Sequence, residues 1–88
     1  MGTETPTVER VLYPNNYGPV RVRVYVRASH VSVEAYCLPG FGWWSCPDSA
    51  TLRRMVDQAL RGTGRKRTAT RTEWRPFSVG WQFFYETS

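Results

Sequence analysis

Cysteine and histidine, which hold most structural metal ions in proteins, are scarce in this sequence. It contains two cysteines, Cys37 and Cys46, and one histidine, His30. Two cysteines are too few for a disulfide framework, and their spacing matches no redox or zinc signature. A structural zinc needs about four ligands of these types. The sequence therefore predicts no metal site and no cofactor.

Long apolar segments are also missing. No run approaches the length of a membrane-spanning helix, and residues 1–7 are polar rather than a hydrophobic leader. We therefore expect no membrane partner. A reducing cytoplasm, in which both cysteines remain free thiols, is the expected location.

Catalytic constellations are lacking as well. A nucleophilic serine or cysteine needs a base nearby, but the hairpin described below places His30 at its tip, far from Cys37. The seven acidic residues are scattered among basic neighbours, so no pair of carboxylates is indicated. The segment 62–66, which contains Gly62 and Gly64, lacks the spacing of a phosphate-binding loop. We predict that the protein is not an enzyme.

Basic residues, in contrast, are abundant. Lysine and arginine number 12 against 7 acidic residues, which gives a formal net charge of +5. All of them except Lys66 are arginine, whose planar group binds phosphate or carboxylate through two hydrogen bonds. A GC-rich genome would produce the same arginine bias. The charge favours polyanionic or acidic partners without identifying one.

The clearest structural signal is a hairpin over residues 20–37 with its turn at Ala28-Ser29. Because side chains alternate between the faces of a strand, this turn places eight small apolar residues on one face. The predicted pairs are Val26 with Val31, Val24 with Val33, Val22 with Ala35, and Val20 with Cys37. The other face is expected to pair Arg23 with Glu34 and Arg21 with Tyr36.

The remaining elements are predicted from periodicity and turn residues. A helix opens at Asp48 or Ser49, carries one apolar stripe and ends at Gly62. Its stripe comprises Leu52, Met55, Val56, Ala59 and Leu60. The expected strands, besides the hairpin, are 7–13, 42–46, 68–74 and 77–86, with the last two connected through Trp74-Arg75-Pro76.

These elements predict a single α+β domain over residues 1–88, with a disordered tail at 1–6. Its antiparallel sheet is a β-meander of five or six strands with one α-helix packed on one face, in the order β-β-β-β-α-β-β. On the last strand one aromatic-rich set of alternate residues is expected to face the core: Phe77, Val79, Trp81, Phe83 and Tyr85.

Two groups of residues are candidates for binding. On the outer face of the hairpin, Arg21, Arg23 and Arg27 recur at alternate positions, roughly 6 to 7 Å apart, which is commensurate with phosphates along a nucleic-acid strand. Tyr25, Tyr36 and Trp43 are expected among them and could stack on bases. A basic connector, Arg65, Lys66 and Arg67 together with Arg61, follows the helix. The alternative interpretation of both groups is ordinary solvated surface.

Two functions follow from this surface chemistry. The first is a small binding protein that contacts nucleic acid through the strand face. The second is a small phage or mobile-element inhibitor or adaptor, of the anti-defence or anti-CRISPR type, that docks on an acidic or nucleic-acid-handling host protein. The element order is similar to that of plant AP2 and phage-integrase arm-binding domains and also to several anti-CRISPR proteins. Because no motif carries over residue by residue, this likeness does not choose between the two.

Overall fold

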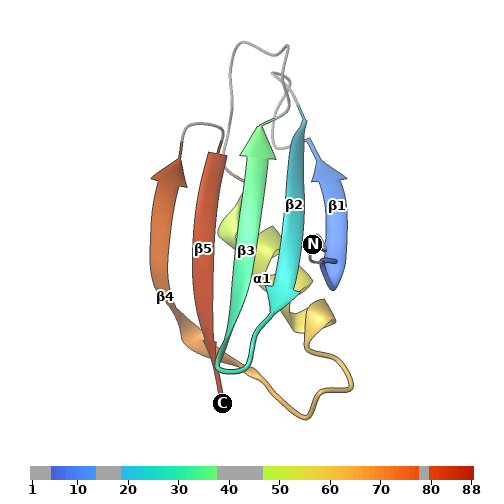
Figure 1. The fold of residues 1–88 in the computed structure, drawn as a ribbon, viewed down its shortest axis with the longest axis vertical. Coiled ribbons are helices and arrows are strands. Elements are labelled where there is room, and N and C mark those ends of the chain that lie inside the picture. The colour runs from blue at the N-terminus through green and yellow to red at the C-terminus, as the bar shows by residue number, and fades with distance from the viewer. Residues whose placement is uncertain (1–4, 14–18, 38–46, 78–79) are drawn as a thin grey trace.

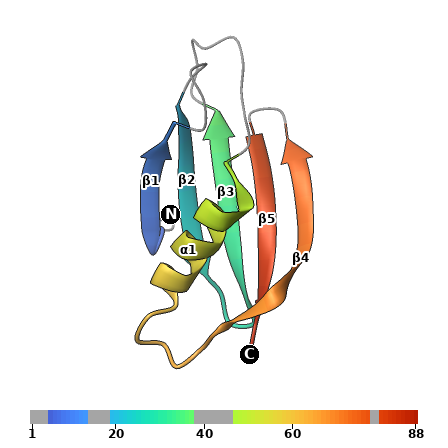
Figure 2. The ribbon, with the colours of Figure 1, turned by 180° about the vertical axis from the view of Figure 1, so that it is seen from behind.

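One antiparallel sheet and one helix make up the described part of the chain. The computed structural model describes residues 5–13, 19–37, 47–77 and 80–88, and residues 69–77 through their backbone. The strands are β1 (Val8–Leu12), β2 (Val20–Val26), β3 (His30–Cys37), β4 (Arg67–Phe77) and β5 (Gly80–Thr87), in the spatial order β1-β2-β3-β5-β4 (Figure 1). The helix α1 (Ser49–Ala59) lies across one face of this sheet (Figure 2). The expected α+β class with an antiparallel sheet is confirmed.

The hairpin formed by β2 and β3 has the register predicted from the sequence. Val26 pairs with Val31, Val22 with Ala35 and Val20 with Cys37, and the Arg27 backbone N–H donates to the His30 carbonyl oxygen at 2.8 Å. Seven of the eight predicted inner residues are buried, and Val26 is partly buried. Alternation of small apolar side chains therefore fixed both the register and the faces of this hairpin.

The predicted order of elements is corrected to β-β-β-α-β-β. The expected meander strand at 42–46 lies outside the described residues. In the structure β3 pairs with β2 on one edge and with β5 on the other, through Tyr36 opposite Gly80 and His30 opposite Glu86. A strand has only two edges, so β3 retains none for a third strand of a meander.

The final hairpin also differs from the prediction. Arg75 and Pro76, expected in the connection, belong to β4 and pair with Gln82 and Trp81, so that Phe77 pairs with Gly80. The connection shifts to residues 78–79, which lie outside the described residues. Proline lacks a backbone N–H and is tolerated in an edge strand, and β4 is an edge strand.

Gly80 begins β5 where two strands approach closely. A Cβ built on Gly80 would overlap the Ala35 carbonyl group of β3. Only glycine allows the backbone to pass at this distance. The residue therefore sets the start of the β3–β5 pairing, which brings the C-terminal strand into the centre of the sheet.

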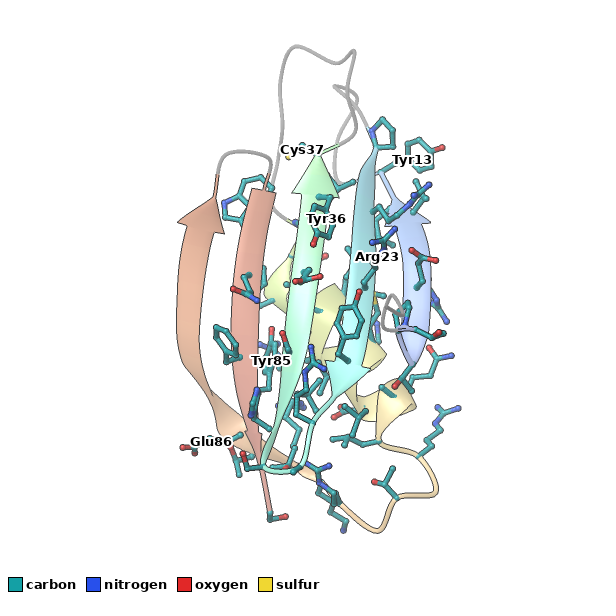
Figure 3. The ribbon with its side chains drawn as sticks, viewed as in Figure 1. Tyr13, Arg23, Tyr36, Cys37, Tyr85 and Glu86 are labelled. Carbon is teal, nitrogen blue, oxygen red and sulfur yellow. The ribbon has the colours of Figure 1, made fainter. Side chains whose placement is uncertain are left out.

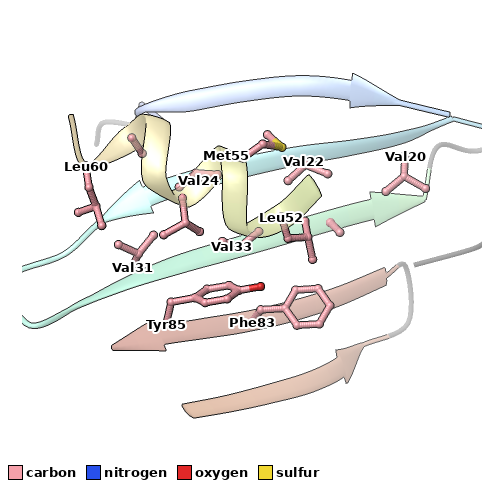
Figure 4. Packing of buried hydrophobic residues seen from close by; sticks show 13 residues of the cluster. Val20, Val22, Val24, Val31, Val33, Leu52, Met55, Leu60, Phe83 and Tyr85 are labelled. Carbon is pink, nitrogen blue, oxygen red and sulfur yellow. The ribbon is translucent and has the colours of Figure 1, made fainter. Parts of the chain in front are cut away.

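The core lies between α1 and the inner face of the sheet (Figure 4). The Asp48 side chain caps the helix by accepting a hydrogen bond from the Thr51 backbone N–H at 3.2 Å. All five residues of the predicted apolar stripe are buried: Leu52, Met55, Val56, Ala59 and Leu60. Phe83 and Tyr85 add the inner face of β5, and Trp81 packs partly against this cluster.

Neighbouring phenylalanines of β5 provide a test of which face is the core. Phe83 is 2% exposed, whereas Phe84 lies on the other face and is partly exposed. We expect Phe83→Ala to lower the free energy of unfolding by about 3 to 5 kcal/mol and Phe84→Ala to lower it clearly less. Urea unfolding followed by tryptophan fluorescence measures both, and equal losses would contradict the assignment of faces.

Candidate nucleic-acid interface

No described element covers the face of the sheet opposite α1, and this open face carries the predicted strand row. Arg21, Arg23, Tyr25 and Arg27 belong to β2 and its end, and Tyr36 lies beside them on β3. Figure 3 views this face directly and shows Arg23 and Tyr36 on adjacent strands. The sequence therefore placed these residues on a common face.

Arg23 is held by contacts within the sheet. Its Nε donates to Glu9 Oε2 on β1 at 2.6 Å, and its guanidinium carbon lies 5.6 Å from the centre of the Tyr36 ring. The hydrogen bond that Arg23 donates to the Glu9 carboxylate raises the pKa of the Arg23 guanidinium above its ordinary value. The predicted partner Glu34 instead accepts from Tyr36 Oη at 2.8 Å. Arg23 and Glu34 are opposite in register, but Arg23 forms its ion pair with Glu9 on β1, the other neighbour of β2.

Burial and Glu34 together alter the acidity of Tyr36. Partial burial, followed by the hydrogen bond to the Glu34 carboxylate, raises the pKa of the Tyr36 phenol to about 12. Both effects disfavour a negative charge on the phenol oxygen. Tyr36 is therefore a neutral hydrogen-bond donor at ordinary pH.

Tyr25 presents little surface for stacking. It is 7% exposed, and the Arg27 guanidinium lies over its ring at 5.0 Å from the ring centre. Cation–π contacts of this kind occupy the ring faces of both Tyr25 and Tyr36. A base could stack on either ring from that side only after an arginine moved away.

Charges on the open face are nearly balanced among the described side chains. The three arginines of β2 and its end share this face with Glu9, Glu34 and Glu86. The Arg23–Glu9 pair is partly exposed, so it adds little to stability, yet it cancels one positive charge. The open face is therefore not the main source of the net positive charge.

The basic connector after α1 is tied to the fold at two points. Arg65 donates from Nη1 to the Arg27 carbonyl oxygen at 2.6 Å and from Nη2 to Thr87 Oγ1 at 2.6 Å. Arg67 binds Asp57 with two hydrogen bonds, at 3.0 and 3.2 Å. Figure 1 shows the connector running past the end of the sheet at which the β2–β3 hairpin turns, and Arg65 reaches the Arg27 backbone there. These two arginines position the connector.

Two shallow grooves lie along α1 and its connector. The connector groove has the basic lining residues Arg61, Arg65, Lys66 and Arg67. The helix groove, between β1 and α1, has the basic lining residues Arg10, Arg54 and Arg61. Asp57 and Arg61 line both, so the grooves adjoin, and Asp57 is the acidic residue in their described lining. The densest positive charge therefore surrounds the C-terminal half of α1.

The predicted binding residues thus fall into two sets. Arg21, Arg23, Tyr25, Arg27 and Tyr36 share the open face, and Arg65, Lys66 and Arg67 share the connector groove. Both sets meet where Arg65 contacts the Arg27 backbone. Trp43 lies outside the described residues.

The binding residues predicted from the sequence did not include Arg10 and Arg54. Arg54 and Arg61 are seven residues apart on a predicted helix, which places them on one side of it, and this spacing was an available signal. For Arg10 the sequence contained no such signal, because the position of Arg10 beside α1 depends on its pairing with Val22 across β1 and β2.

Metal and cofactor chemistry finds no support in the described parts of the chain. They contain no group of three or more His, Cys, Asp and Glu residues that could hold a metal ion. Cys37 is buried, and this burial raises the pKa of its thiol above the ordinary value. α1 is 11 residues long, and no helix in the described ranges is long and apolar enough to cross a membrane.

Comparison with known proteins does not assign a family. No protein-family model, no curated protein and no solved structure matches this chain. Its function is therefore argued from its surface alone.

The raised pKa of Tyr36 gives a prediction for alkaline pH. The folded pKa of about 12 lies above the ordinary value of 10.0, so folding favours the neutral phenol. Tyr36 therefore contributes stability below about pH 10, and this contribution is lost as the pH rises toward the folded pKa. The difference in absorbance titration between wild type and Tyr36→Phe should show a phenol ionising near pH 12. A midpoint near the ordinary value would contradict the assignment.

Proposed function

We propose that this protein is a non-enzymatic module that binds nucleic acid, with the basic residues of the connector groove as its principal contacts. The observation that supports this is the crowding of Arg61, Arg65, Lys66 and Arg67 around one acidic residue, Asp57. Phosphate contacts by clustered basic side chains supply most of the affinity of sequence-independent binding.

The connector groove fits a polyanion better than the open face does. Asp57 is engaged by Arg67, which removes the repulsion that a free carboxylate would exert on a phosphate. Arg61 and Lys66 are exposed, and within the described part of the chain neither side chain forms a hydrogen bond or an ion pair. The predicted row of Arg21, Arg23 and Arg27 stays a prediction, and it needs a separate test because Arg23 is already paired.

Salt-dependent binding tests the proposal. Fluorescence anisotropy with labelled duplex and single-stranded oligonucleotides should show binding at about 50 mM salt that falls steeply by about 200 mM. Arg61→Ala/Lys66→Ala should weaken binding and reduce the slope of log affinity against log salt by about 2, since each phosphate contact contributes about 1. Arg53→Ala, an exposed arginine of α1 outside both grooves, is the control and should bind like the wild type.

The possible outcomes distinguish an error in the proposed function from an error in the proposed binding site. Absence of binding to any oligonucleotide at low salt would refute the nucleic-acid function. Binding that survives Arg61→Ala/Lys66→Ala but is lost in Arg21→Ala/Arg23→Ala/Arg27→Ala would keep the function and move the site to the predicted strand row. Thermal unfolding of each variant excludes loss of the fold as the cause.

Docking on a protein, as an inhibitor or adaptor, is a second candidate, supported by the exposed hydrophobic side chains at the end of β1. Val11 and Arg21 are opposite in register, as are Arg21 and Tyr36. Val11 is 41% exposed and Tyr13 is 74% exposed, and these are the exposed large hydrophobic residues of the described chain. Tyrosine and arginine beside apolar surface are enriched in the energetic centres of protein interfaces.

A nuclease-treated pull-down from host lysate distinguishes this candidate. A docked partner should be retained after nuclease and lost with Val11→Ser/Tyr13→Ser, while Arg61→Ala/Lys66→Ala should retain it. Loss of every partner on nuclease treatment would instead favour nucleic acid.

A further inference from the structure

The helix groove brings three guanidinium groups into line beside α1. Arg10 lies opposite Val22 on the helix side of the sheet, and its Nη2 donates to Gln58 Oε1 at 2.7 Å. Gln58 stands between Arg54, four residues earlier on α1, and Arg61, three residues later in the turn that follows the helix. A bonded Gln58 therefore holds Arg10 between the two helical arginines.

Two neighbouring carboxylates, Asp48 and Asp57, compensate these three positive charges only in part. Arg54 Nη2 donates to the neutral Thr51 hydroxyl at 3.2 Å, and Asp57 is bound by Arg67 on the connector side. Asp48, the cap of α1, accepts hydrogen bonds from Thr51 and also attracts the Arg54 guanidinium electrostatically. Exposed arginines around a groove attract a ligand that carries several negative charges.

Aromatic rings are absent from the described lining of both grooves. The lining comprises arginine, lysine, threonine, glutamine, glycine and aliphatic side chains together with Asp57. Proteins that bind single strands combine positive charge with rings on which unpaired bases stack. Grooves that offer charge without rings contact phosphates and leave the bases to pair with each other.

We propose that the helix groove binds the phosphate backbone of a double-stranded nucleic acid, and that Arg10, Arg54 and Arg61 are its contacts. This inference rests on the proposed nucleic-acid function and specifies the form of the ligand. At the helical rise of about 1.5 Å per residue, residues 54 and 61 are separated by about 10 Å, which corresponds to about three phosphate-to-phosphate steps along the axis of one strand. Arg61, shared with the connector groove, links the two sets of contacts into one track.

Matched oligonucleotides and matched arginine variants test this proposal. The probes are a duplex DNA of about 20 base pairs, a duplex RNA of the same sequence and the corresponding single strands, all at about 50 mM salt. We expect at least one duplex to bind about tenfold or more tightly than its single strands. Arg54→Ala should weaken duplex binding severalfold and lower the salt slope by about 1, whereas its neighbour Arg53→Ala should change neither.

Each outcome bears on a separate claim. Equal or tighter binding of single strands overturns the duplex proposal while the nucleic-acid function stands. Equal effects of Arg54→Ala and Arg53→Ala overturn the helix groove as the site. Gln58→Ala provides a second check, because releasing Arg10 should weaken duplex binding without removing a charge. No binding of any probe would refute the function itself.

Discussion

The two-sided pairing of β3 is the constraint on which the rest of the structure depends. Val31, Val33 and Ala35 are fully buried, and they lie opposite Val26, Val24 and Val22 on one side. On its other side β3 pairs with β5, which adds Phe83 and Tyr85 to the same inner face. α1 packs on this surface, so its position, and that of the connector behind it, follows from β3.

Local patterns were sufficient to predict the hairpin and the helix. Small apolar residues alternate on both sides of Ala28-Ser29, and a slip of one residue would turn all of them to solvent, so only one register buries them. The stripe from Leu52 to Leu60, capped by Asp48, likewise determines the buried side of α1. These elements could be predicted because their information lies within about 20 residues of sequence.

The remaining differences come from contacts between distant segments. Pairing of β5 with β3 joins residues about 50 positions apart, and no local pattern selected it over a meander. The same holds for the site. Arg23 was correctly placed on a face, but its partner Glu9 lies on a strand whose pairing with β2 the sequence did not specify. Predicting a face is therefore easier than predicting which charges on it remain available.

Availability of charge also distinguishes the arginines within the connector groove. Arg67 must break its two hydrogen bonds to Asp57 before the same N–H groups can donate to a phosphate. Arg65 must likewise break its hydrogen bonds to Thr87 and to the Arg27 carbonyl oxygen. Breaking such contacts offsets part of what a new phosphate contact contributes. Arg61 and Lys66, both exposed, bear no such cost. Arg65 and Arg67 are therefore better understood as the residues that hold the connector in shape, and under the proposed function Arg61 and Lys66 would be the ones that contact the phosphates.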